Sequence, residues 1–116
     1  MKIIKTMQEY SKRELYYFTQ APNVQKMSEK AGETILLDGF VLYDVASDDA
    51  DKERKVLCVR DKDGNYYGTN SATFIKAFME IVDLFAEDDN EKFEAFTVHP
   101  GVNAKNGREF ITCLLA

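Results

Sequence analysis

The sequence has few of the residues from which metal and redox sites are built. Its 116 residues include a single histidine, His99, which excludes a site made of several histidines. The two cysteines, Cys58 and Cys113, stand in apolar alternating segments and form no C-x-x-C pair. We therefore expect two buried thiols, which a cytosolic compartment would keep reduced.

Long hydrophobic runs are also lacking. No stretch approaches the roughly 18 apolar residues that a membrane helix needs. The opening residues, MKIIKTMQEYSKRE, turn polar after a short apolar patch and contain neither the apolar core nor the small-residue cleavage site of a signal peptide. We expect no membrane partner and a cytoplasmic location.

Sequence motifs for catalysis are absent as well. Neither G-x-x-x-x-G-K-[ST] nor G-x-G-x-x-G occurs. A catalytic nucleophile would have to pair with His99, and nothing in the sequence places an orienting group beside it. The acidic runs SDDAD (47–51) and EDDNE (87–91) lack the spacing of a calcium loop, so solvated turns are the simpler interpretation. We predict a protein that is not an enzyme, with no cofactor and no metal.

The length and composition fit one globular domain spanning residues 1–116. Hydrophobic residues make up 45% of the chain and charged residues 30%, as is ordinary for such a domain. Residues 1–32 are predicted to form an N-terminal helical segment, and residues 33–116 an OB-like core.

Two short helices are predicted in the N-terminal segment. Ser11, three residues before Glu14, forms a capping-box pattern that favours a helix from about Lys12 to Thr19. The stretch NVQKMSEKAG allows a second short helix that ends at Gly32.

The core shows period-two alternation interrupted by one helical stripe. Asn70 and Ser71 can cap the helix, whose apolar residues recur every three or four positions from Phe74 to Phe85. Gly39 marks a bend or bulge in the first and longest strand. The predicted strands are ETILLDGFVLYDV (33–45), KVLCVRD (55–61), YYGTN (66–70), FEAFTVH (93–99) and REFITCLL (108–115).

The resulting order is β-β-β-α-β-β, with short connections that favour antiparallel pairing. This is the order of the OB-fold, so the fold class is α+β or mainly β, a five-stranded antiparallel OB-like barrel with its helix at one end. A plain α+β sheet with the helix packed on one face predicts the same order and stays open as an alternative.

Basic and aromatic residues gather on two hairpins. From Lys52 to Lys76 there are six basic and three acidic residues in a chain of net charge −5, so charge is segregated along the sequence. Single-stranded nucleic acid is bound by aromatic rings that stack on bases and by cations that contact phosphates. The candidate binding residues are Arg54, Lys55, Arg60, Lys62, Tyr66, Tyr67, Lys105, Arg108 and Phe110. Equally, tyrosines on strands often only pack across the sheet, and charges beside hairpins often only solubilise.

Four stretches resemble the small single-stranded DNA-binding proteins encoded by phages and prophages of Gram-positive gut bacteria. They are VQKMSEKAGETI, FVLYDV, DKDGNYYGTNSATFIKAFMEIVDLF and HPGVNAKNGREFITCLL, which together reach from about Val24 to Leu115. The resemblance implies a non-enzymatic OB-like protein that coats single-stranded DNA during phage replication or recombination in the bacterial host cytoplasm. It does not transfer contact residues one by one, so the candidate residues above come from the sequence pattern alone.

The chain departs from many such coating proteins at its C-terminus. They often end in a disordered acidic tail that recruits partners, whereas this chain ends in the apolar FITCLLA. Recruitment of replication or recombination proteins would then fall to the acidic loops around Asp48 and Asp88 or to the N-terminal helices. Those helices could instead form a homo-oligomer interface, because ELYYFTQ carries more aromatic surface than a solitary surface helix needs.

Two hypotheses of different classes follow. The first is binding of single-stranded DNA with little sequence preference. The second is an acidic protein–protein interaction module, such as a phage-encoded inhibitor that mimics nucleic acid, which the net charge and the acidic runs favour. The placement of charge discriminates between them: basic hairpins along a concave face indicate DNA binding, and carboxylates there indicate mimicry.

Overall fold

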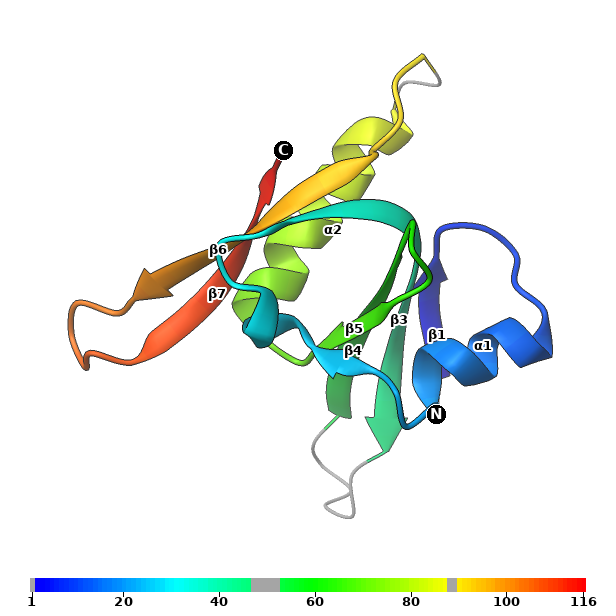
Figure 1. Ribbon diagram of the computed structural model, residues 1–116, viewed down its shortest axis with the longest axis horizontal. Helices are drawn as coiled ribbons and strands as arrows, with labels where there is room; N and C mark the ends of the chain where they lie inside the picture. The colour runs from blue at the N-terminus through cyan, green and yellow to red at the C-terminus, as the bar shows by residue number, and fades with distance from the viewer. Residues whose placement is uncertain (1, 47–52, 88–89) are drawn as a thin grey trace.

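The chain folds into one strongly curved mixed β-sheet, a half-barrel, with an α-helix on each face (Figure 1). The computed structural model describes residues 2–46, 53–87 and 90–116. The strands are β1 (Lys2–Thr6), β2 (Gln25–Lys26), β3 (Thr34–Ala46), β4 (Glu53–Asp61), β5 (Tyr66–Thr69), β6 (Ala95–Val102) and β7 (Glu109–Leu115). The helices are α1 (Lys12–Thr19), the 3-10 helix η1 (Met27–Lys30) and α2 (Ala72–Ala86).

Strand β3 is an internal strand of the sheet, and the order of the paired strands is β2-β5-β4-β3-β6-β7. Its first residues, Thr34 to Leu36, pair with β6, and from Leu37 onward it pairs with β4. The pairing register with β4 shifts between Leu37 and Gly39, so the bend predicted at Gly39 is confirmed. A side chain at Gly39 would collide with the hydroxyl of Tyr10 and approach the Phe18 ring to 3.3 Å, which explains why glycine stands there.

The predicted core strands are all present, but the strand count and the purely antiparallel pairing are wrong. Strand β1 pairs antiparallel with β3 along the edge that β6 leaves open, where it satisfies backbone groups of β3. Strand β2 pairs parallel with β5, Gln25 opposite Tyr67 and Lys26 opposite Gly68. The half-barrel remains consistent with an OB-like architecture. Short strands such as these give too little alternation to be recognised in the sequence.

The helix predictions have mixed outcomes. Helix α1 has the predicted bounds and the predicted capping box, with Ser11 accepting from the Glu14 amide at 3.2 Å. Helix α2 is capped by Ser71, which accepts from the Phe74 amide at 3.3 Å. The second predicted N-terminal helix forms only as the four-residue 3-10 helix η1, because Gln25 and Lys26 extend to pair with β5. That the chain is one domain stays a prediction.

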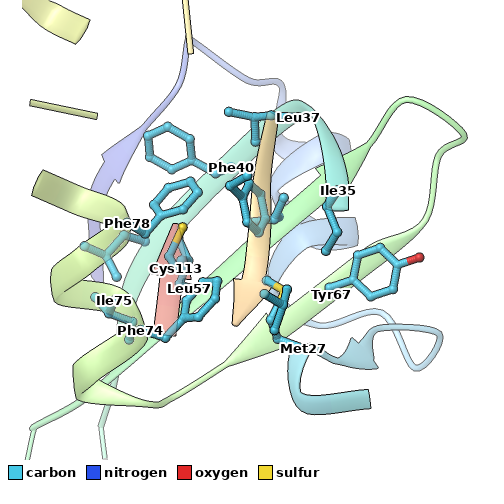
Figure 2. Close-up of a cluster of buried hydrophobic side chains, with 14 of the residues drawn as sticks. Met27, Ile35, Leu37, Phe40, Leu57, Tyr67, Phe74, Ile75, Phe78 and Cys113 are labelled. Carbon is cyan, nitrogen blue, oxygen red and sulfur yellow. The ribbon is translucent and has the colours of Figure 1, made fainter. Parts of the chain in front are cut away.

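The two helices cover opposite faces of the sheet and create two cores. Between α2 and the sheet, Phe74 and Phe78 point from the helix into the first core (Figure 2). Their ring centroids lie 5.9 Å and 5.5 Å from that of Phe96. On the other face, α1 inserts Phe18 against Val41, Tyr43 and Cys58. Adjacent strand residues point to opposite faces, which is why β3 and β4 contribute to both cores.

Candidate nucleic-acid interface

A groove lies between the β3–β4 hairpin and the β6–β7 hairpin, which diverge from the body of the protein (Figure 1). Its volume is about 1260 Å³ and it is open to solvent. The residues that line it come from four regions of the chain. They are Lys26, Ser28, Ala31, Val45, Arg54, Val56, Gly68, Thr69, Asn70, Ser71, Pro100, Gly101, Val102, Glu109, Phe110 and Ile111.

The charge of the groove lining is weakly positive in an acidic chain. Among these lining residues, Lys26 and Arg54 are cations and Glu109 is the one carboxylate. Both cations are exposed, and within the described part of the chain neither takes part in an ion pair. With the Asn70 amide oxygen turned toward β4, it accepts from the Arg54 guanidinium, with Nε at 3.0 Å. The groove thus offers two cations that can approach a phosphate.

An aromatic ring lies flat across one wall of the groove. Phe110 on β7 stands directly opposite Gly101 on β6. A Cβ placed on Gly101 would come within 2.7 Å of Phe110 Cε2 and 2.9 Å of Cε1, so the ring covers the glycine and requires its lack of a side chain. Phe110 is nevertheless 41% exposed, which leaves surface of the ring open to a ligand.

Two further cations stand at the tip of the β6–β7 hairpin. The loop is held by its own side chains: Asn103 Oδ1 accepts from the Lys105 amide and Asn106 Oδ1 from the Arg108 amide, both at 2.9 Å. Gly107 takes a φ of +67°, which closes the turn. Lys105 and Arg108 are exposed, and no ion pair involves them among the residues described. The hairpin therefore presents both charges beside the groove.

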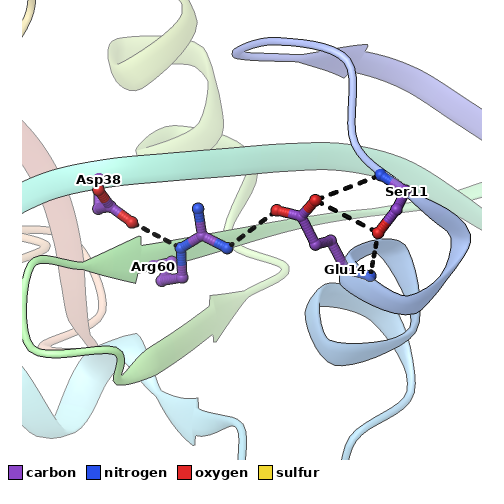
Figure 3. A network of polar contacts seen from close by, with 4 residues as sticks. All are labelled: Ser11, Glu14, Asp38 and Arg60. Atoms are coloured by element: carbon purple, nitrogen blue, oxygen red, sulfur yellow. Dashed lines mark hydrogen bonds and ion pairs between the residues drawn. The ribbon is translucent and has the colours of Figure 1, made fainter.

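Arg60 differs from these exposed cations, because its side chain is engaged in contacts within the protein. Its side chain, 17% exposed, forms ion pairs with Asp38 at 2.7 Å and Glu14 at 3.6 Å (Figure 3). Its guanidinium carbon lies 5.2 Å from the centre of the Phe18 ring. Burial opposes its charge, but hydrogen bonds with Tyr66 and Asp38 outweigh burial and raise the pKa of Arg60. The charge of Arg60 is thus already balanced within the protein, where it joins α1 to the sheet.

The two adjacent tyrosines point to opposite faces of β5. Tyr66 packs edge-on to Phe18 with ring centroids 5.2 Å apart, on the α1 face. Tyr67 is only 4% exposed and belongs to the α2 core, with its hydroxyl pointing out toward Asp61 at 3.3 Å (Figure 2). A base cannot stack on a ring that the core already covers, so the geometry removes Tyr67 from the stacking candidates.

The remaining cations of the predicted set lie outside the groove. Lys62 is exposed on the β4–β5 turn, beside a separate cleft of about 290 Å³. Lys55 is exposed on β4, but it follows Arg54 directly and so points to the opposite face. The structure brings together Arg54 and Phe110, with Lys105 and Arg108 nearby, and separates them from the other five.

Sequence reasoning missed two parts of this groove. The sequence pattern places Lys26 in a helix and does not predict its position on a strand beside Gly68. The pattern also places Gly101 in a loop, although β6 continues through Val102. A glycine opposite an aromatic residue in a hairpin was the available signal for Gly101.

Other kinds of site have less support. Across residues 2–46, 53–87 and 90–116, no group of three or more His, Cys, Asp or Glu side chains could hold a metal ion. In those same ranges, no helix is both long and apolar enough to cross a membrane. The acidic run 47–51 and Asp88 lie outside the described residues, so the structure does not place those carboxylates.

Residues 3–116 match the family model of the Phi29 type, described as phage single-stranded DNA-binding protein. No curated protein and no solved structure gives a significant match.

Proposed function

Because the chain belongs to the phage single-stranded DNA-binding proteins of the Phi29 type, we propose that the groove between its two hairpins holds the bound strand. Family membership gives single-stranded DNA as the ligand. The place of binding on this chain and a role in phage DNA replication or recombination are what we propose in addition. Coating of single strands requires no catalytic group.

The observation that carries this assignment is the Phe110 ring lying flat over Gly101 in the groove wall. A ring supported from behind by a strand is held in one orientation, so little conformational entropy is lost when a base stacks on it. Stacking of this kind contributes about 1–3 kcal/mol per base and tolerates any base. Binding with little sequence preference follows from that tolerance.

Cations around the ring supply the contacts to phosphates. Lys26 and Arg54 lie in the groove, and Lys105 and Arg108 at the tip of its β6–β7 wall. If all four neutralise a phosphate, the logarithm of the binding constant falls with the logarithm of salt concentration with a slope of about −3. Lys55 and Lys62 add long-range attraction only, and Arg60 and Tyr67 support the fold.

A fluorescence-polarisation titration with labelled oligo-dT tests the ligand and its place together. The wild-type chain should bind at low micromolar concentration in low salt. Arg54→Gln should weaken binding and reduce the magnitude of the salt slope by about 0.7. Lys92→Gln, which removes an exposed cation from the segment after α2, is the matched control and should leave both quantities unchanged. No binding by the wild-type chain would refute the function, and equal effects of the two variants would refute the groove.

The rival hypothesis, an acidic module that mimics nucleic acid, predicts carboxylates along the concave face. Among the residues that line the groove between the two hairpins, Glu109 is the one carboxylate, whereas Lys26 and Arg54 are cations. This balance of charge favours DNA binding. A gel-shift series with single-stranded DNA, duplex DNA and RNA separates the two functions. Binding to none of the three would favour the acidic module, whereas preference for single-stranded DNA would exclude it.

A further inference from the structure

Helix α1 exposes two tyrosine rings that neither core uses. Tyr16 is 48% exposed and Tyr17 is 43% exposed, while Phe18 beside them is buried in the core. The ring of Tyr17 contacts the ring of Tyr16 edge-on, with their centroids 5.6 Å apart. It also stacks with the ring of Tyr66, with centroids 6.4 Å apart and an angle of 29° between the planes of Tyr17 and Tyr66. The three rings form a continuous row from the helix surface to strand β5, which we call the tyrosine row.

Two cationic side chains lie beside the tyrosine row on the surface of α1, as the helical repeat requires. Residues four apart lie on the same face of a helix, which places Lys12 beside Tyr16 and Arg13 beside Tyr17. Both cations are exposed, and neither is in an ion pair within the described ranges. Glu14 is turned away from them into the capping box and the pair with Arg60. Rings next to unpaired cations are the combination that binds single strands.

The row continues the groove. Tyr66 and Gly68 lie on the same face of β5, two residues apart, and so are separated by about 7 Å. Gly68 lines the groove, and Lys26, its partner on β2, lines it too. A strand that leaves the groove at Gly68 passes over Val24, whose Cγ1 lies 3.2 Å from a Cβ built on Gly68, and then meets Tyr66 and the exposed rings of α1.

We propose that the tyrosine row is a second binding segment for single-stranded DNA, onto which a strand passes from the groove over Tyr66 to Tyr17 and Tyr16. This rests on the proposed function of the groove. The distance from Gly68 through Tyr66 to Tyr17 is roughly 13 Å, enough for about two to four nucleotides. Its occupant is DNA and not a second protein, because the row is continuous with the groove and carries cations beside its rings.

A length series of oligo-dT, from about 4 to 20 nucleotides, tests the second segment. The variant is Tyr16→Ala with Tyr17→Ala, and its matched control is Tyr16→Phe with Tyr17→Phe, which keeps both rings. Oligonucleotides that fill the groove alone should bind wild type and both variants equally. On the longest ones the alanine variant should bind about fivefold more weakly or worse, and its affinity should stop rising about two to four nucleotides earlier.

Tyrosine emission gives an independent readout. The chain has no tryptophan and six tyrosines, so its intrinsic fluorescence comes from tyrosine and is quenched where bases contact the rings. The phenylalanine control should keep the affinity for long oligonucleotides and lose part of this quenching. A thermal unfolding midpoint within a few degrees of wild type shows that both variants are folded.

The outcomes separate the two proposals. If the wild-type chain binds no oligonucleotide, the proposed function fails and the tyrosine row fails with it. If it binds but the alanine variant follows the wild-type length dependence, only the row is refuted. A uniform loss at every length also refutes the row, because it places the tyrosines in the groove's own support. A changed sedimentation coefficient of the alanine variant without DNA refutes it as well, since α1 would then be a protein interface.

Discussion

Substitution of Gly101 by alanine tests whether the Phe110 ring is the stacking surface. The added Cβ would overlap Phe110 Cζ and lie 2.7 Å from Cε2, so the ring has to move by about 1 Å or more to reach normal contact distance. Alanine suits a strand better than glycine by roughly 0.5–1 kcal/mol of backbone entropy, so the fold itself should not be weakened. The expected result is weaker DNA binding at nearly unchanged stability.

The size of the effect follows from a double-mutant cycle with Phe110→Ala. Loss of the ring should cost about 1–3 kcal/mol of binding free energy, which is about fivefold to 150-fold in Kd. Gly101→Ala should cost a part of that. The double variant should bind like Phe110→Ala within about 0.5 kcal/mol, because the methyl group has nothing to displace once the ring is gone.

Polarisation titrations with oligo-dT at fixed salt measure all four corners of this cycle, and thermal melts check the fold. Leu114→Ala is the matched control, because Leu114 lies on the same strand with 47% exposure, against 41% for Phe110, and does not line the groove. Its affinity should equal that of wild type. Strict additivity of the Gly101 and Phe110 changes, or unchanged binding by Phe110→Ala, would refute the stacking role.

Three further predictions concern stability. Arg60→Ala should lower the free energy of unfolding by about 2 kcal/mol in urea titrations, because ion pairs and ring contacts between α1 and the sheet are lost. The affinity of the folded variant for oligo-dT should stay the same. A large loss of affinity at unchanged stability would return Arg60 to the set of DNA-binding candidates. Phe78→Ala should cost about 3–5 kcal/mol, because the ring is fully buried among other phenylalanines, and a loss below 1 kcal/mol in the same titration would contradict the packing. Burial raises the pKa of both Cys58 and Cys113 to about 12. The folded state therefore keeps these thiol protons to higher pH than the unfolded state does. Each thiol stabilises the fold below pH 9 and loses that contribution as the pH rises toward 12. Urea titrations should therefore show roughly 2 kcal/mol less stability per thiol at pH 10.5 than at pH 7, and a Cys58→Ser, Cys113→Ser variant with the same pH dependence would refute the assignment to the thiols.

Much of the fold could be predicted because the signals are local. The capping box of α1, the N-cap serine of α2 and the apolar stripes of both helices lie within single segments, and alternation marks every long strand. The bend at Gly39 was visible because glycine within a long strand is unusual. Strands β1 and β2 escaped prediction because their conformation depends on partners far away in sequence, β3 and β5.

The binding residues were harder to predict, because exposure is decided by tertiary packing. Tyr66 and Tyr67 read alike in the sequence, yet one supports α1 and the other lies in the α2 core. Arg60 read as a free cation, since the carboxylates that balance it come from α1 and β3. Phe110 stays a candidate because Gly101 leaves room for its ring outside the core, a relation between two strands.

Strand β3 makes the two halves of the protein energetically dependent on each other. One continuous backbone segment pairs with β6 at its start and with β1 and β4 beyond the bulge at Asp38. Opening either half would strip hydrogen bonds from the strand that the other half needs. We therefore expect a loss of structure in one half to weaken the other, so that both halves unfold together in a single transition.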